Sequence, residues 1–128
     1  MVFIDKETND LSYKIIGCAY NVHKELGPGL LESAYETCLC YELSKIEINY
    51  EKQKGLPIIY KDVTLDCGYR IDILVENKIV IELKTVEKLL PIHTAQIMTY
   101  LKLSNKHLGL LFNFYNANLQ NGIKRYVL

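Results

Sequence analysis

The feature of this sequence that points most directly to chemistry is a set of three ionisable residues inside an apolar stretch, residues 69–84. Asp72, Glu82 and Lys84 stand among isoleucines, leucines and valines, which are typical residues of a protein core. A buried carboxylate costs several kcal/mol of stability unless it is paired, protonated or bound to a metal ion. These charges therefore require a partner, a metal ion or a reaction that accounts for them.

The stretch has the sequence pattern of a β-hairpin. Alternation and β-branched residues predict two strands, 69–75 and 78–84, with Glu76 and Asn77 in the turn between them. Residues two apart in a strand face the same side, so Glu82 and Lys84 project together, about 6.6 Å apart along the strand. Asp72 lies on the neighbouring strand.

The length of the turn decides whether Asp72 and Glu82 can share a site. Directly opposite residues of an antiparallel pair face the same side, so the register must be one that sets 72 opposite 82. A two-residue turn would pair Val75 with Lys78 and place the two carboxylates on opposite faces of the sheet. We therefore predict an odd-length loop, such as residues 76–78, or a bulge.

If the carboxylates converge, a bound cation is expected between them. Two carboxylates about 4 Å apart repel by about 4 kcal/mol at an effective dielectric constant of about 20, so one would be protonated without a cation. The oxygens of Asp72 and Glu82, with the Leu83 carbonyl, favour Mg²⁺ or Mn²⁺ over zinc. Lys84 would orient or deprotonate a water and offset charge on a phosphoryl oxygen, which suits phosphodiester hydrolysis.

Length and composition set the outer limits. A chain of 128 residues is expected to form a single domain, residues 1–128, with a real hydrophobic core. Fifteen basic and fifteen acidic residues leave no net charge, so a site for a polyanion must be local. The apolar runs are too short for a membrane helix and the N-terminus is no signal peptide, which favours the cytoplasm.

The rest of the chain supplies the elements that would position these residues. Helical spacing predicts a pair of helices interrupted by Gly27-Pro28-Gly29, and Pro91 suits the first turn of a third helix. The nearly continuous apolar run 108–114 predicts a strand covered on both faces and paired in parallel through a helical crossover. The predicted elements are helices 11–26, 31–44 and 91–103, and strands 47–54, 58–60, 64–67, 69–75, 78–84, 108–114 and 123–127.

Two motifs resemble those of a known family. Asp72 followed by Glu82-Leu83-Lys84 resembles the D...(D/E)xK signature of the PD-(D/E)xK nuclease superfamily, with Ile71 in place of its frequent proline. The segment Gly29-Leu30-Leu31-Glu32-Ser33-Ala34-Tyr35 resembles the motif of the GxxExxY family, a small branch assigned to that superfamily. The resemblance covers almost the whole chain, from about Ile15 to Tyr126.

The resemblance implies a fold and further site residues. The implied fold is a restriction-endonuclease-like α/β core in the order ααββββαβ, a central mixed sheet flanked by helices. In the RecB-like branch a glutamate on the preceding helix joins the site, a position that Glu32 matches. A QxxxY motif follows the ExK strand in that branch, and Gln96 and Tyr100 match it on one face of the third helix.

The expected function is a metal-dependent nuclease that hydrolyses the backbone of DNA or RNA. Asp72 and Glu82 would hold Mg²⁺ or Mn²⁺, and Lys84 would assist the attacking water. The alternative is a catalytically silent module of the same fold that binds nucleic acid or protein, which the neutral charge and small size favour. A homodimer would enlarge the binding surface.

Each site residue also has a purely structural alternative. Glu82 and Lys84 can form a salt-bridged, solvated strand face, since short motifs occur often by chance. Glu32 can be an ordinary first-turn residue that the helix dipole favours. Tyr35 is expected to be structural, packing one helical turn further on.

Overall fold

The computed structural model describes residues 3–128 and has an α/β fold. Its helices are α1 (Lys6–Leu26), α2 (Glu32–Lys45) and α3 (Pro91–Ser104), with a 3-10 turn η1 (Leu119–Gly122). Its strands are β1 (Tyr50–Gly55), β2 (Ile58–Tyr60), β3 (Val63–Leu65), β4 (Arg70–Val75), β5 (Ile79–Lys84), β6 (Leu108–Asn113) and β7 (Ile123–Val127). None of the helices described is long and apolar enough to cross a membrane.

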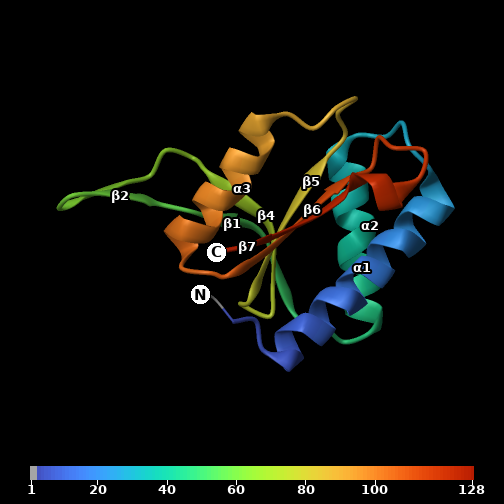
Figure 1. The fold of residues 1–128 in the computed structure, drawn as a ribbon, viewed down its shortest axis with the longest axis horizontal. Helices are drawn as coiled ribbons and strands as arrows, with labels where there is room; N and C mark the ends of the chain where they lie inside the picture. The colour runs from blue at the N-terminus through green and yellow to red at the C-terminus, as the bar shows by residue number, and fades with distance from the viewer. Residues whose placement is uncertain (1–2) are drawn as a thin grey trace.

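The centre of the fold is a five-stranded mixed sheet in the order β1-β4-β5-β6-β7 (Figure 1). β5 and β6 are parallel and are joined through α3, whereas the other neighbouring pairs are antiparallel. The predicted α/β core and its helical crossover are confirmed. The described chain has five strands before α3 and two after it, one more on each side than the order ααββββαβ; β2 and β3 form a separate sheet, and β7 is an edge strand of the central sheet.

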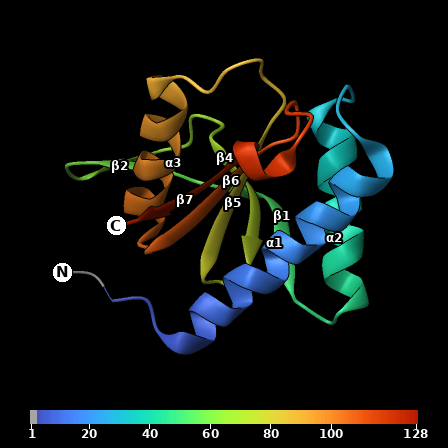
Figure 2. The same ribbon diagram turned by 45° about the vertical axis from the view of Figure 1, so that its right-hand side comes forward.

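The sheet is buried on both faces, which explains the apolar run in β6. Figures 1 and 2 show α1 and α2 on one side of the strands and α3 on the other. Ile73, Ile81 and Phe112 belong to the core under α1 and α2, whereas Leu74 and Val80 pack with Ile97 of α3. All six residues of β6 are buried, as expected for a strand between two layers of helices.

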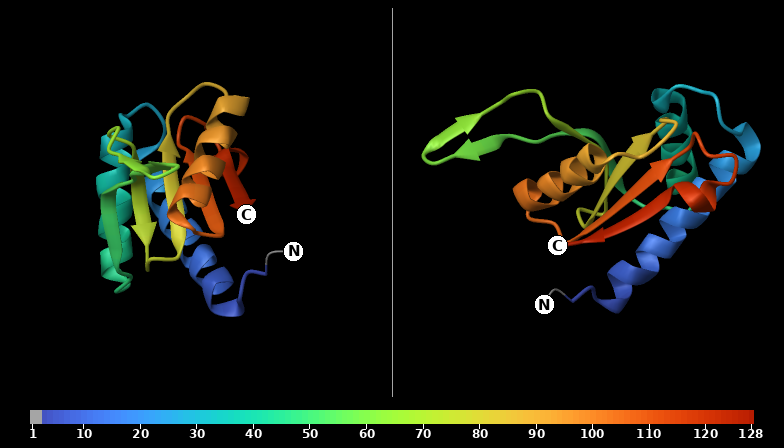
Figure 3. Two further views of the ribbon diagram at one scale, coloured as in Figure 1. Left: turned by 90° about the vertical axis from the view of Figure 1, so that its left-hand side faces the viewer. Right: turned by 45° about the horizontal axis from the view of Figure 1, so that its top comes forward.

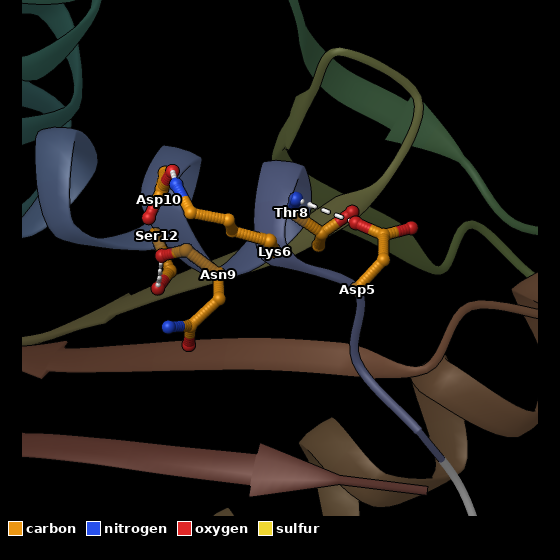
Figure 4. A network of polar contacts seen from close by, with 6 residues as sticks. All are labelled: Asp5, Lys6, Thr8, Asn9, Asp10 and Ser12. Carbon is orange, nitrogen blue, oxygen red and sulfur yellow. Dashed lines mark hydrogen bonds and ion pairs between the residues drawn. The ribbon is translucent and has the colours of Figure 1, made fainter.

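Helix α1 begins earlier than the apolar pattern indicates. The predicted start at Leu11 is wrong, since the helix begins at Lys6, behind an N-cap at Asp5. The Asp5 carboxylate accepts a hydrogen bond of 2.7 Å from the Thr8 amide, and Lys6 pairs with Asp10 one turn along the helix (Figure 4). A capping residue satisfies an amide that the helix leaves without a partner, so a polar first turn can be helical.

The hairpin of β4 and β5 has the loop length that the shared site requires. Val75 pairs with Ile79, so the loop consists of the three residues 76–78, and Glu76 and Asn77 adopt left-handed backbone angles. The two residue numbers of every pair, such as 73 and 81, add up to 154, so the same register sets Asp72 opposite Glu82. The prediction of an odd-length loop is confirmed.

An extended arm, residues 56–69, leaves the main sheet between β1 and β4. It contains the β2–β3 pair, which forms a separate two-stranded sheet, and a hydrogen bond of 2.9 Å from the Leu56 amide to the Tyr69 carbonyl closes its base. Figure 3 shows the arm projecting past α3. Two predicted strands are shorter than expected. Within the arm, β3 ends at Leu65 instead of Cys67, and before the arm β1 begins at Tyr50 instead of Glu47, which has a left-handed backbone.

The chain after β5 is fixed by a buried amide at the end of β6. Asn113 accepts a hydrogen bond from the Val86 amide at 3.1 Å and donates one to the Val86 carbonyl at 2.8 Å. Gly122 packs against the same residue so closely that a Cβ atom there would lie 2.3 Å from the Asn113 carbonyl oxygen. This junction holds the segment that directly follows Lys84.

Gly122→Ala is expected to destabilise the protein by about 1–3 kcal/mol, because the new methyl group must displace backbone atoms of Asn113. Gly17→Ala is the matched control, since Gly17 lies within α1 and a Cβ there meets no atom within 4 Å. The control should stabilise the helix by up to about 1 kcal/mol. Urea unfolding followed by circular dichroism measures both, and a Gly122→Ala protein as stable as the wild type contradicts the close packing.

Candidate active site

Asp72 and Glu82 reach across the open end of the hairpin to each other's strands. The Glu82 carboxylate accepts a hydrogen bond of 2.9 Å from the Asp72 amide, and the Asp72 carboxylate accepts one of 2.8 Å from the Leu83 amide. The ladder pairs between β4 and β5 end at Ile73 and Ile81, so these side chains bridge the strands where the backbone pairing stops. The sequence prediction that these two carboxylates lie opposite each other therefore matches the geometry.

Burial favours the protonated forms of both acids, and the charge of Asp72 adds to this effect at Glu82. Glu82 is only 3% exposed, and desolvation followed by the charge of Asp72 raises its pKa to about 8. Desolvation also raises the pKa of Asp72, against the opposing effects of the Leu83 amide and of Lys84. The charge of Lys84 compensates only part of this cost, since both pKa values remain raised.

Lys84 is connected to α3 through a short chain of hydrogen bonds. Its Nζ donates to Gln96 Oε1 at 2.8 Å, and Gln96 Nε2 donates to the Tyr100 hydroxyl at 3.3 Å. Gln96 and Tyr100 are one turn apart on α3, the helix that joins β5 to β6. The structure therefore brings together Lys84, Gln96 and Tyr100, which the sequence assigned to one site.

Glu32 and Leu83 occupy different places around this centre. Glu32, exposed at the start of α2, accepts a hydrogen bond of 3.2 Å from the amide of Thr85, the residue after Lys84. It lies at the rim of the site and contributes to the raised pKa of Glu82. Leu83 is buried, and its amide is the group that contacts the Asp72 carboxylate.

A family model described as the PD-(D/E)XK nuclease superfamily matches residues 9–126 of the chain. The chain belongs to the PD-(D/E)XK nuclease superfamily. Comparisons with curated proteins and with solved structures gave no match. Asp72, Glu82 and Lys84, which match the D...ExK pattern in sequence, lie on the adjacent strands β4 and β5. Membership indicates a nuclease-type function.

The donor atoms fit the hard divalent metals that nucleases of the PD-(D/E)XK superfamily generally use. Neither Asp72 nor Glu82 takes part in an ion pair found in residues 3–128. Within the same range, Glu82 Oε2 accepts the Asp72 amide and no hydrogen bond to Glu82 Oε1 is found, so Oε1 would be the metal-facing oxygen. No group of three or more Asp, Glu, His and Cys side chains in this range has metal-binding geometry, so other oxygens would complete the shell.

Sequence reasoning missed two polar residues beside Asp72. Gln53 of β1 donates from Nε2 to Glu36 of α2 at 2.9 Å and, more weakly, to Asp72 Oδ1 at 3.4 Å. Gln53 has a left-handed φ of 50° and is the one residue of β1 between Tyr50 and Gly55 without a Cα partner on β4. Such backbone strain concentrates at functional sites of proteins. A glutamine in a polar, exposed strand gives no sequence signal for this role.

The stability of the metal-free protein is expected to fall as the pH rises from about 5 to about 8. The pKa of Glu82 is about 8 in the folded protein and 4.5 in the unfolded chain. Between these values only the folded protein keeps the proton, so the folded state is favoured at the lower pH. The slope is at most about 1.4 kcal/mol per pH unit for one proton. Urea unfolding in EDTA at several pH values measures it.

Glu82→Gln is the matched variant for this titration. It keeps an acceptor for the Asp72 amide and removes the ionisable group, so its stability should vary less over the same pH range. Equal slopes for the two proteins would show that Glu82 is not the group that titrates.

Gln53→Gly is expected to be about 1 kcal/mol more stable than Gln53→Ala, because only glycine adopts a left-handed backbone without a steric cost. Both variants lose the same side-chain hydrogen bonds, so the difference reports the backbone alone. Glu51, in the same strand with ordinary backbone angles, provides the control pair, for which alanine should be the more stable. Chemical denaturation of the four proteins measures both differences in the free energy of unfolding. If alanine is the more stable residue at position 53 as well as at position 51, the backbone of Gln53 is not strained.

Proposed function

We propose that this protein is a metal-dependent phosphodiesterase that hydrolyses the backbone of DNA or RNA, with Asp72 and Glu82 holding Mg²⁺ or Mn²⁺. The observation that carries the proposal is the pair of opposed carboxylates at the end of the β4–β5 hairpin. Glu82 is buried and Asp72 is partly buried, and neither has a cationic side chain as an ion-pair partner among residues 3–128. A divalent ion would resolve this conflict without protonation.

Each of the other residues has a proposed role. A bound metal would supply Lewis acidity and a more acidic water. Lys84 offsets the charge that develops on a phosphoryl oxygen and orients the attacking water, and its bond to Gln96 fixes its position. Tyr100 in turn holds Gln96. The Leu83 carbonyl is proposed as a further metal ligand.

We also propose that the chain belongs to the GxxExxY family and the RecB-like branch. The contacts that support this proposal are those of the GxxExxY motif at the rim of the same site. Gly29 has a φ of 107°, which only glycine adopts readily, and Glu32 follows it to reach the Thr85 amide. The buried Tyr35 donates to the Gly27 carbonyl at 2.6 Å and accepts from the Leu30 amide at 3.2 Å. Tyr35 thus holds the turn that presents Glu32.

The second candidate function is a catalytically silent module that binds nucleic acid or protein. The balanced charge favours it, because a chain with fifteen basic and fifteen acidic residues has no overall field to attract a duplex. The intact set of site residues, with Glu82 buried among them, favours the enzyme. The single-domain organisation, the cytoplasmic location and a homodimer remain predictions.

Asp72→Asn and Lys84→Ala are each expected to lower cleavage by at least about 100-fold, because they remove a metal ligand and the transition-state cation respectively. The assay incubates the protein with plasmid and single-stranded DNA or RNA, with Mg²⁺, Mn²⁺ or EDTA. Lys14→Ala, an exposed change on α1, is the control and should leave cleavage unchanged.

A second measurement separates metal binding from cleavage. Mg²⁺ or Mn²⁺ should raise the thermal stability of the wild type and raise that of Asp72→Asn much less, since only ligands of the folded state stabilise it. Cleavage that persists in both site variants indicates a contaminating nuclease. No cleavage of any substrate, with metal binding intact, favours the silent module.

A further inference from the structure

A pocket of about 520 Å³ opens directly beside Lys84, between the base of the arm and α3. Its size is in the range of small-molecule sites, about 300–1,000 Å³. Lys84, Gln96 and Tyr100 form the wall that it shares with the candidate active site. The remaining wall is mainly apolar or aromatic, with Ile58 and Tyr69 from the arm and Leu103 from α3.

Tyr69 provides an exposed aromatic surface at this pocket. Its side chain is 47% exposed, and its ring meets the ring of Tyr100 edge to face, with centroids 6.4 Å apart and an interplanar angle of 67°. Tyr69 precedes β4 by one residue and is three positions from Asp72. A flat group that stacks on this ring would therefore be attached close to a phosphate held at Lys84.

The charged and polar side chains that line the pocket indicate the chemistry of its ligand. Lys84 is the only lysine or arginine among the described residues that line it, so the pocket has one point for a phosphate and an uncharged interior. His93 adds a polar group: its Nδ1 accepts a hydrogen bond of 2.9 Å from the Leu90 amide, which leaves Nε2 as the ring nitrogen for a ligand. A flat, uncharged group with acceptor edges, joined to one phosphate, matches these features.

We propose that this pocket binds an unpaired nucleobase next to the phosphate at Lys84, so that the substrate is single-stranded or locally unpaired nucleic acid. This inference rests on the proposed function and adds the class of substrate to it. A base within a duplex has both faces stacked and its pairing edge occupied, so it enters such a pocket only after it leaves the stack. Stacking on aromatic side chains also supplies affinity that does not depend on a strongly basic protein.

Tyr69→Ala is expected to weaken the binding of single-stranded oligonucleotides by about fivefold or more, the smallest effect expected for the loss of one stacked base. The probe is a short fluorescently labelled DNA or RNA strand, followed by anisotropy in EDTA so that metal-dependent cleavage does not consume it. Tyr69→Phe, which keeps the ring, should bind as the wild type does. Tyr41→Ala is the control, because Tyr41 is an exposed tyrosine of α2 on the other side of the sheet.

Two duplex probes test the requirement for an unpaired base. A perfect duplex of the same sequence should bind more weakly than the single strand and respond little to Tyr69→Ala. A duplex with one bulged nucleotide distinguishes the two sources of the base: binding as tight as that of the single strand supports an extruded base, and binding as weak as that of the perfect duplex supports a single strand.

The outcomes separate this inference from the proposed function. Cleavage that requires Asp72, with equal oligonucleotide affinity in Tyr69→Ala and Tyr41→Ala, overturns the pocket and leaves the nuclease intact. Binding that depends on the Tyr69 ring, without any cleavage, supports the pocket and overturns the phosphodiesterase. Failure of every oligonucleotide to bind overturns the inference and points to a protein partner for the apolar wall.

Discussion

The register between β4 and β5 is the constraint on which the rest of the site depends. Because the loop of residues 76–78 has three residues, Asp72 is opposite Glu82 and both carboxylates reach the open end of the same hairpin. Side chains alternate between faces, so a loop with one residue fewer would separate the two acids by the whole thickness of the sheet. Lys84 is placed by the same register, two residues after Glu82 on β5.

Folding this hairpin buries two groups that would be more stable in water. The amides of Asp72 and Leu83 offset part of that cost by donating to the carboxylates, but desolvation still raises both pKa values, and the charge of Asp72 adds to the rise at Glu82. The left-handed backbone of Gln53 lies beside the same acids. Unfavourable charge and one strained residue thus lie together at the open end of the hairpin, as stability arguments expect of a functional site.

The sequence was sufficient for the parts of the structure that depend on periodicity. The apolar run of β6 predicted its burial between two helical layers, and parity alone predicted the odd loop at residues 76–78. The start of α1 was missed because its first turn is polar and is stabilised by the Asp5 cap instead of by the core. Gln53 and the pocket at Tyr69 depend on α2 and α3 approaching strands that are distant in sequence, which no local pattern reports.

The separation in sequence between contacting residues has a consequence for the order in which the site can be assembled. Asp72 and Glu82 are ten residues apart, and Lys84 and Gln96 are twelve apart, so both contacts can form by local closure. Glu32 reaches Thr85 over a separation of 53 residues, so this contact waits for slower, non-local closure. A partly folded chain can therefore carry the acidic pair and the partner of the lysine before α2 supplies the rim, and the complete constellation exists only in the finished protein.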